Sequence, residues 1–247
     1  MLTMRNNYLL FLIGLLFIQL SCDNESIAPD EEILGRSYYP VETGKYITYS
    51  YDSVIIVKGG LERDSLSGFL KDEIGEKLNT SNGEESYRVY KYWKRDILDP
   101  WRLINLEVLT KSINKVILSE GNLSFIKMVF PNEKGITWDG NALFDERIEV
   151  MIASEPIEVY NNWEYEITDK NLEKNILGEI RQVLEVLHVD QENALQRRFS
   201  SESYVKGVGL VSKNMMIYDT QNFQPNKPWE TFAQGGFRLV QEMIEHN

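Results

Sequence analysis

The feature that most constrains the fold is an alternation with a period of two residues, which dominates the chain from Tyr38 onward. In residues 45–57, KYITYSYDSVIIV, every second side chain would point to the same face of an extended chain, and residues 85–95, ESYRVYKYWKR, repeat the pattern. Successive side chains of a β-strand point to opposite faces of a sheet, so this period is typical of strands. The alternation predicts a chain built mainly from β-strands.

Further runs of the same kind extend this prediction along the chain, and turn residues separate several of them. The additional predicted strands are residues 103–110, 115–119, 123–130, 148–152, 163–168, 181–189, 195–200, 209–218 and 236–244. Asn82-Gly83 and Glu120-Gly121-Asn122 fit hairpin loops, because Asn and Gly tolerate positive φ. Short joins of this kind connect strands that are neighbours in a sheet.

The connections also predict how the strands pair. No amphipathic helix longer than two or three turns is evident, and parallel strands would need helical crossovers, so the sheet should be antiparallel. Roughly ten strands in one flat sheet would expose a large apolar face and two unpaired edges. We therefore expect an all-β fold, with one domain over residues 38–247 whose curved antiparallel sheet forms an open barrel or half-barrel of roughly ten strands. Gly207, Gly209 and Gly235-Gly236 stand where bulges or bends would be needed.

The charge of the chain excludes one broad class of function. The formal net charge is -12, and no cluster of Lys and Arg provides the basic face that neutralises phosphates in nucleic-acid-binding proteins. The single cysteine also excludes an intramolecular disulfide, so packing alone must hold the domain. The hydrophobic content of 43% is sufficient for a core of that kind.

Residues 1–21 have the layout of a secretory signal. A polar start with Arg5 is followed by an apolar run over residues 8–20 and a small residue, Ser21. A membrane-spanning helix needs roughly 20 apolar residues, so the run is short for a span and normal for the apolar region of a signal. We expect residues 1–21 to be removed.

Cys22 stands at the end of this signal, in the sequence Leu20-Ser21-Cys22. This sequence resembles the lipobox of bacterial lipoproteins, in which the cysteine thiol receives a diacylglycerol. It departs from the usual lipobox at Gln19, where an apolar residue is common, and at Ser21, where Gly or Ala is commonest. The resemblance implies lipidation of Cys22 and a membrane anchor, since two or more acyl chains hold a protein stably on a membrane. The alternative is an ordinary secretory signal followed by a chance cysteine.

Residues 22–37 read as an acidic tether between the anchor and the domain. The segment DNESIAPDEEILGRS contains a proline and a glycine and has no hydrophobic periodicity. Acid-rich segments directly after a lipidated cysteine resemble the surface-export signals of Bacteroidota lipoproteins. That resemblance implies a lipid-anchored protein of the outer membrane that is exposed at the cell surface. A plain solubilising linker is the alternative.

Several blocks of the mature chain resemble one uncharacterised family of Bacteroidota lipoproteins. In chain order these blocks are YYPVETGKYITYSYDS, TWDGNA, VLEVLHVDQENAL, ESYVKGVGLVSK and GFRLVQEMIEHN. They are similar to the family's YYP…G…Y.Y opening, its W.GN turn and its Y.KGVGLV strand, although Ile47 stands where an aromatic residue is usual. The resemblance implies an envelope location and a β architecture, and the family has no activity to transfer.

Motifs for catalysis or metal binding are weak in this chain. There is no G-x-S-x-G sequence, and the two histidines are His188 and the penultimate residue His246. His188 lies close to Asp190 and could serve a Ser-His-Asp site, but a strand histidine at a sheet surface or core edge is the favoured interpretation. The segment DGNALFDERIEV superficially resembles a calcium loop but lacks its turn glycine and its final carboxylate. We predict no metal and no cofactor. A glycosidase would need only two well-placed carboxylates among the 38 acidic residues, which leaves a glycan hydrolase open as a less favoured function.

Aromatic residues, at 11% of the chain, are the most numerous remaining candidates for contacts with a ligand. Trp138, in TWDGN, and Trp229, in NKPWET, occur in polar turn sequences, so we expect these two to be exposed in loops and to be candidate ligand contacts. Packing in the core and across strands is the alternative for any single aromatic residue. Ser53 and Ser65, each between an aspartate and an apolar residue, resemble the acceptor motif of Bacteroidota O-glycosylation.

Taken together, these features predict a lipid-anchored envelope lipoprotein that is not an enzyme. The β-domain would bind an unidentified ligand or a partner protein, and the membrane would be contacted through Cys22. The first alternative is a carrier that holds a lipid or an acyl chain in an apolar half-barrel cavity.

Overall fold

The structure of the chain is a computed structural model that describes residues 33–79 and 84–247, most of which lie in strands. The predicted signal, Cys22, most of the predicted tether and the predicted Asn82-Gly83 turn lie outside the described residues. Within them there is no α-helix, only the short 3-10 helices η2 (Arg36–Tyr38), η3 (Lys58–Gly60) and η4 (Trp229–Thr231). None of these turns is a candidate for crossing a membrane.

Twelve strands form one sheet, and two more form a separate hairpin. In chain order the strands are β1 (Tyr46–Val57), β2 (Glu62–Leu78), β3 (Glu85–Lys94), β4 (Arg102–Lys111), β5 (Lys115–Glu120), β6 (Leu123–Val129), β7 (Thr137–Trp138), β8 (Glu149–Ile152), β9 (Glu155–Glu158), β10 (Tyr165–Ile176), β11 (Glu179–Glu192), β12 (Gln196–Val205), β13 (Gly209–Asp219) and β14 (Gly235–His246). The all-β antiparallel prediction is confirmed, with twelve strands in the sheet where roughly ten were expected.

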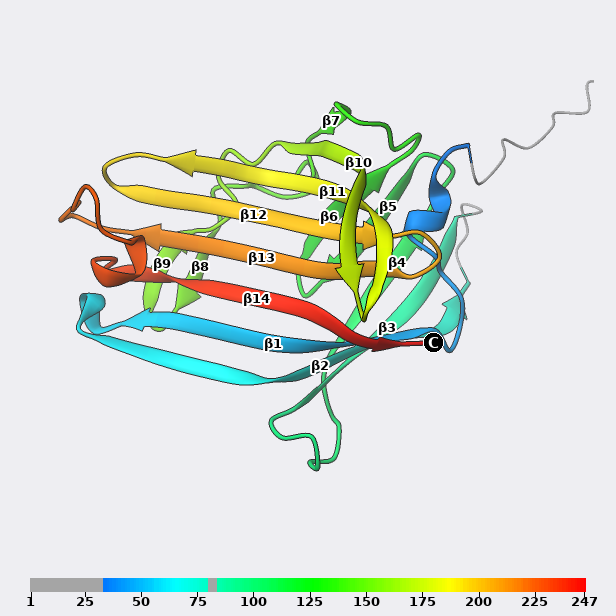
Figure 1. Cartoon of the computed structure of the whole chain (residues 1–247), viewed down its shortest axis with the longest axis horizontal. Coiled ribbons are helices and arrows are strands. Elements are labelled where there is room, and N and C mark those ends of the chain that lie inside the picture. Colours follow the sequence, from blue (N-terminus) through cyan, green and yellow to red (C-terminus); the bar gives the residue numbers. More distant parts are fainter. Residues whose placement is uncertain (1–32, 80–83) are drawn as a thin grey trace, which may run out of the picture. The chain divides into compact units, whose positions relative to one another are not determined.

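The order of strands in the sheet is β6-β5-β4-β3-β2-β1-β14-β13-β12-β11-β10-β7, and β8 pairs with β9. Most neighbours are consecutive along the chain, as hairpins require, and every pair is antiparallel. Two pairs are exceptions: β7 pairs with β10, and β1 pairs with the last strand and places Ile47 opposite His246. Figure 1 shows β1 running beside the red β14. This pairing joins the two halves of the sheet.

The two outer edges of the sheet meet, so the sheet curls into a nearly closed barrel. The backbone N–H of Ile126 in β6 donates to the carbonyl of Gly140, which follows β7, at 2.8 Å. The indole Nε1–H of Trp138 in β7 donates to the carbonyl of Ile126 at 2.7 Å. We call the contacts among Ile126, Trp138 and Gly140 the seam. Unpaired backbone groups at the edges of a large sheet are costly, and the seam provides hydrogen-bond partners for some of them.

Strand β2 is absent from the predicted strands, although it is the longest in the sheet. Its sequence ERDSLSGFLKDEIGEKL is strongly polar, and its first half is exposed on both faces, so no apolar alternation is visible there. The short strands β7 and β9 were also not predicted. Both are too short to show an alternation of their own, and β7 pairs with β10, which is distant in sequence.

Glycines allow the tight approaches within the sheet. Gly236 has φ +108°, and a Cβ on it would lie 1.8 Å from the carbonyl oxygen of Ile217 in the neighbouring strand. Gly207, at φ +75°, lies in the short turn between β12 and β13. The predicted turn at Gly121 is confirmed, with φ +58° between β5 and β6. A side chain at Gly236 is excluded by the neighbouring backbone, whereas Gly207 and Gly121 have open space around them and are favoured by their positive φ alone.

The folded part begins before Tyr38. The side-chain amide of Asn132 donates to the carbonyl of Gly35 at 2.8 Å, and its backbone N–H donates to that of Leu34. Gly35 is buried against this asparagine, and a Cβ on it would collide with the Asn132 side chain. Residues 34–37, part of the expected tether, therefore pack on the domain.

Candidate functional site

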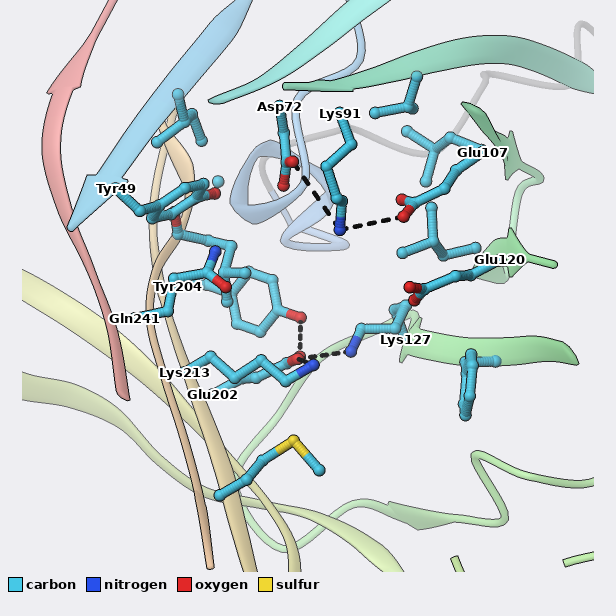
Figure 2. A pocket seen from close by; sticks show the side chains of 18 of the residues that line it. Tyr49, Asp72, Lys91, Glu107, Glu120, Lys127, Glu202, Tyr204, Lys213 and Gln241 are labelled. Atoms are coloured by element: carbon cyan, nitrogen blue, oxygen red, sulfur yellow. Dashed lines mark hydrogen bonds and ion pairs between the residues drawn. The ribbon is translucent and has the colours of Figure 1, made fainter. Parts of the chain in front are cut away.

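A cavity of about 330 Å³ lies inside the curved sheet. It is lined by residues of strands β1 to β6, β8 and β10 to β14 and of the segments that join them. In most of these strands the lining residues alternate, which is the expected result when one face of a strand points inward. Phe125, Leu239 and Met215 belong to its apolar lining, whereas several charged side chains reach into it from other strands. Figure 2 shows these charged groups around the cavity.

The first charged group of the cavity consists of Asp72, Lys91 and Glu107. The strand register places Asp72 directly opposite Lys91. The Lys91 Nζ lies 3.0 Å from a Glu107 carboxylate oxygen and 3.8 Å from the Asp72 Oδ1. Burial raises the pKa of both carboxyls, while Lys91 opposes that rise. Burial also opposes the charge of Lys91, but the two carboxylates raise its pKa above the usual value. One ammonium is thus shared between two acids.

The second charged group surrounds Glu202 of β12. Its carboxylate accepts hydrogen bonds from Lys127 Nζ and from the Tyr204 hydroxyl, each at 2.6 Å. Lys213 Nζ lies 3.8 Å from the same carboxylate. Burial alone would raise the pKa of Glu202, but the charge of Lys127, more than any other contact, holds it well below its usual value. Glu202 is therefore ionised inside the barrel.

The ion pair between Lys127 and Glu202 spans the interior. Lys127 belongs to β6 and Glu202 to β12, and these strands are not neighbours in the sheet. The pair consequently links two separate parts of the barrel wall across the space between them. Buried pairs of this kind cost desolvation and are poor stabilisers, but they are strongly destabilising when one partner is lost.

His188 is enclosed next to this pair. Its ring stacks on Tyr165, with centroids 4.1 Å apart, and its side chain is among the least exposed in the domain at 1%. The Nδ1 atom is hydrogen-bonded to Ser200 Oγ at 2.9 Å, and Nε2 lies 3.5 Å from Glu202, beyond hydrogen-bond distance. Burial lowers the pKa of His188 to about 4, so the ring is neutral at pH 7.

The predicted Ser-His-Asp possibility with Asp190 is wrong. Asp190 faces away from His188, is largely exposed, and pairs with Arg197 at 2.6 Å. A strand histidine was the favoured interpretation, but the ring is in the interior rather than at a surface or core edge. The neighbours that the fold supplies are Ser200 at Nδ1 and Glu202 near Nε2, whereas a serine hydrolase places its nucleophile at Nε2 and its acid at Nδ1. The absence of catalytic activity stays a prediction.

The two tryptophans predicted to be loop-exposed are held by packing. Trp229 is 7% exposed in η4 and stacks on Phe232 at 4.8 Å, so the expectation of exposure is wrong for this residue. Trp138 is half-buried and belongs to the seam described above, where its ring lies 5.6 Å from that of Tyr165. Neither residue lines the cavity. Trp138 lies in β7 and Trp229 in η4, and each element packs its aromatic ring against the domain.

The remaining predicted sites differ in their surroundings. Ser53 is 6% exposed within β1, whereas Ser65 is exposed in β2. Whether either hydroxyl carries a sugar stays a prediction, as does lipidation of Cys22, which lies outside the described residues. In the calcium-like segment, Asp139 Oδ1 accepts the backbone N–H of Asn141, and Asn141 is itself buried. Across the described ranges, no group of three or more His, Cys, Asp or Glu side chains is placed to hold a metal ion.

The charged lining of the cavity was not predicted from the sequence, although a signal for it exists. Lys91 alternates with Val89 and Trp93 on one face of its strand, and Glu107 shares a face with Leu109. A charged residue on an otherwise apolar face is a sign that this face is not a simple core. Which of these charges meet depends on the strand register and on the curl of the sheet.

Comparisons with known proteins give limited similarity. No protein-family profile and no curated protein matches the chain. Among solved structures, a putative lipoprotein from Parabacteroides distasonis aligns with a TM-score of 0.38 at 9% sequence identity, covering 85% of this chain and 98% of its own. A putative exported protein with a YmcC-like fold from Bacteroides fragilis aligns with a TM-score of 0.37 and the same identity and coverage. Neither similarity is close enough to assign a family or a function.

Proposed function

We propose that this chain is a lipid-anchored protein of the outer membrane, exposed at the cell surface, whose β-domain binds a small molecule inside its barrel and does not act on it chemically. The observation that carries the binding part is the cavity of about 330 Å³ inside the sheet. This volume lies at the lower end of the range for small-molecule sites, which is roughly 300–1,000 Å³.

Polar atoms without partners support an occupant for this cavity. Asp72 Oδ1 and His188 Nε2 are both buried and make no hydrogen bond, and both residues line the cavity. Buried polar atoms left without a hydrogen bond each cost on the order of 1–3 kcal/mol. A ligand that contacts these atoms would recover part of that cost.

The charged lining favours a ligand with polar groups over a bare hydrocarbon. An apolar half-barrel cavity was the expectation for an acyl-chain carrier, but Lys91, Glu107, Lys127 and Glu202 all line this one. A hydrocarbon placed against them would remove water from the ion pairs without replacing its hydrogen bonds. The carrier function is therefore less well supported than capture of a small polar or amphipathic molecule.

A hydrolase is also less well supported. Two of the lining carboxylates, Asp72 and Glu107, contact the same Lys91 ammonium. A glycosidase needs one carboxylic acid that donates a proton and one free carboxylate that attacks or activates water. An ammonium shared by the two acids stabilises the ionised form of both, so it does not make one of them the proton donor and the other the free carboxylate.

The binding part is tested by native mass spectrometry of the full chain purified gently from its own envelope. We expect an added mass on the order of a few hundred daltons that is lost on denaturation. A matched pair of variants locates it: Leu239→Trp fills the cavity from β14, and Leu66→Trp adds the same bulk at an exposed position of β2. The added mass should disappear in the first variant and remain in the second. A bare polypeptide mass in the wild type, or equal occupancy in both variants, would contradict the proposal.

The anchoring part rests on Cys22 and is tested separately. In Cys22→Ala we expect loss of acyl labelling and release of the protein from the membrane fraction, because one thiol carries the whole attachment. Ser26→Ala, four residues away, is the control and should stay membrane-bound. If Cys22→Ala remains in the membrane with its label, the protein is not anchored in this way.

A further inference from the structure

The charged side chains of the cavity are arranged with opposite excess on two sides. On the side of β2 to β5, the carboxylates of Asp72 and Glu107 contact the single ammonium of Lys91, and Glu120 of β5 also lines the cavity. The charge of Glu120 acts on both Lys91 and Glu107. Negative charge therefore prevails on this side.

Positive charge prevails around Glu202 of β12, because Lys213 of β13 and Lys127, which reaches across the interior from β6, place two ammonium groups beside this one carboxylate. Figure 2 shows Glu202 and Lys213 facing Asp72 and Lys91 across the space between them. The two sides influence each other, because the charge of Lys213 lowers the pKa of Asp72 while burial raises it.

Each side also has hydrogen-bonding capacity in reserve. Lys213 Nζ lies 3.8 Å from the Glu202 carboxylate, beyond hydrogen-bond distance, and its side chain is 30% exposed. On the opposite side, the Asp72 side chain is 26% exposed and its carboxylate makes no hydrogen bond, while its buried Oδ1 lies 3.8 Å from Lys91. An open donor and an open acceptor thus line the same cavity from opposite walls. Apolar side chains of the lining, among them Phe125, Leu239 and Met215, occupy other parts of the wall.

From this layout we infer that the ligand is a zwitterion, a small molecule with an amine at one end and an acidic group at the other, of the kind found in amino acids and short peptides. The inference rests on the proposed function and specifies its ligand. The amine would contact Asp72 beside Glu107 and Glu120, and the acidic group would contact Lys213 beside Lys127. Such contacts are charge-assisted hydrogen bonds, which are stronger than neutral ones. The apolar lining would contact the carbon chain between the two ends.

The test uses three matched series of probes and the full chain. The probes are straight-chain ω-amino acids from 4-aminobutanoate to 8-aminooctanoate, together with the carboxylates and the primary amines of the same lengths. Binding is measured by equilibrium dialysis at fixed ionic strength. We expect at least one ω-amino acid to bind about tenfold more tightly than the carboxylate and the amine of its length. Equal binding of either single-charge probe, or no binding of any ω-amino acid, overturns the inference.

Two variants test which residue binds each charged end of the ω-amino acid. In Lys213→Met the ω-amino acid should bind no better than the amine, and in Asp72→Asn it should bind no better than the carboxylate. Lys227→Met, at an exposed loop position outside the cavity lining, is the control and should behave as the wild type. If both cavity variants retain the full preference, these residues do not hold the charged ends.

Failure of this inference is distinguishable from failure of the proposed function. Native mass spectrometry could find an uncharged or singly charged molecule in the wild-type protein that is lost in Leu239→Trp. That result would support the proposed function and contradict the inference of a zwitterionic ligand. If the wild-type protein has no added mass and binds no probe, both the proposed function and the zwitterionic ligand are contradicted.

Discussion

Among single side chains, the inward-facing charges and His188 define the character of the site. The residues that sequence patterns singled out as ligand contacts, Trp138 and Trp229, are structural. The cavity is lined instead by charged side chains within strands, such as those of Lys91, Glu107 and Glu202. Loop residues are usually the first candidates for binding because loops carry function in most folds. In a curved sheet with an internal cavity the argument is reversed, since the concave face itself provides the site.

His188 should make the stability of the domain depend on pH. Its pKa is lowered to about 4 by burial, from an ordinary value of 6.5, with Glu202 opposing the shift and Lys127 and Lys213 adding to it. Between these two pH values the unfolded chain binds a proton that the folded chain does not, so stability is lost as the pH falls from about 6.5 to about 4. The loss should total about 3 kcal/mol over the window.

Urea unfolding of the wild type and of His188→Gln at pH 7 and pH 4.5 measures this dependence. The wild type should lose about 2–3 kcal/mol more than the variant does between the two pH values, because only the wild type carries the titrating ring. His246→Gln, which changes an exposed histidine near the chain end, should follow the wild type. Parallel losses in wild type and His188→Gln would show that another group controls the acid sensitivity.

At the level of strands, the sheet is held closed by a seam that is much shorter than the junctions between its long strands. Neighbouring long strands share extended ladders, whereas β6 and the segment after β7 meet at Ile126 through two hydrogen bonds from the seam. One of these bonds comes from a side chain, the indole of Trp138. The barrel is therefore expected to open first at this place, which is a low-stability part of the fold.

Replacing Trp138 by Phe tests the seam. The variant keeps an aromatic ring beside Tyr165 but removes the donor to the Ile126 carbonyl, at a cost of about 1 kcal/mol. The backbone amide of Ile126 should then exchange about fivefold faster with deuterium, while amides in β1 and β14 stay unchanged. Trp101→Phe, outside the seam, is the control. An unchanged rate at Ile126 would mean that the Gly140 contact alone maintains closure.

Across the molecule, the buried pair Lys127–Glu202 connects parts of the wall that the sheet does not join directly. Loss of either partner should cost about 3–5 kcal/mol, since a buried charge is left without its partner. Removing both in Lys127→Met/Glu202→Leu should cost less than the sum of the two single losses.

Urea unfolding of the two single variants and the double variant gives the coupling free energy. A coupling on the order of 1–3 kcal/mol is expected for residues in direct contact. Lys134→Met, which removes an exposed ion-pair partner of Asp169, is the control and should change stability by less than about 1 kcal/mol. Simple additivity of the Lys127 and Glu202 losses would show that the pair does not bridge the barrel in solution.

The period of two and the missing crossover helices were sufficient for the all-β class, the antiparallel pairing and the curl of the sheet, because alternation and turn chemistry are local properties of the chain. The strand β2 was missed because its exposed residues show no apolar face. The closing seam was missed because β7 has only two residues and shows no alternation, and because β6 and β7, although close in sequence, lie at opposite ends of the strand order.

The cavity and its chemistry could not be read from the chain in this way. Lys127 and Glu202 are separated by 75 residues, and their contact follows from the curvature of the sheet and from the register of strands between them. A shift of one residue in the register of any strand would turn its inward side chains outward, so the same sequence would place different residues in the cavity. Local patterns thus define what each strand is, while long-range pairing defines which charges share the interior.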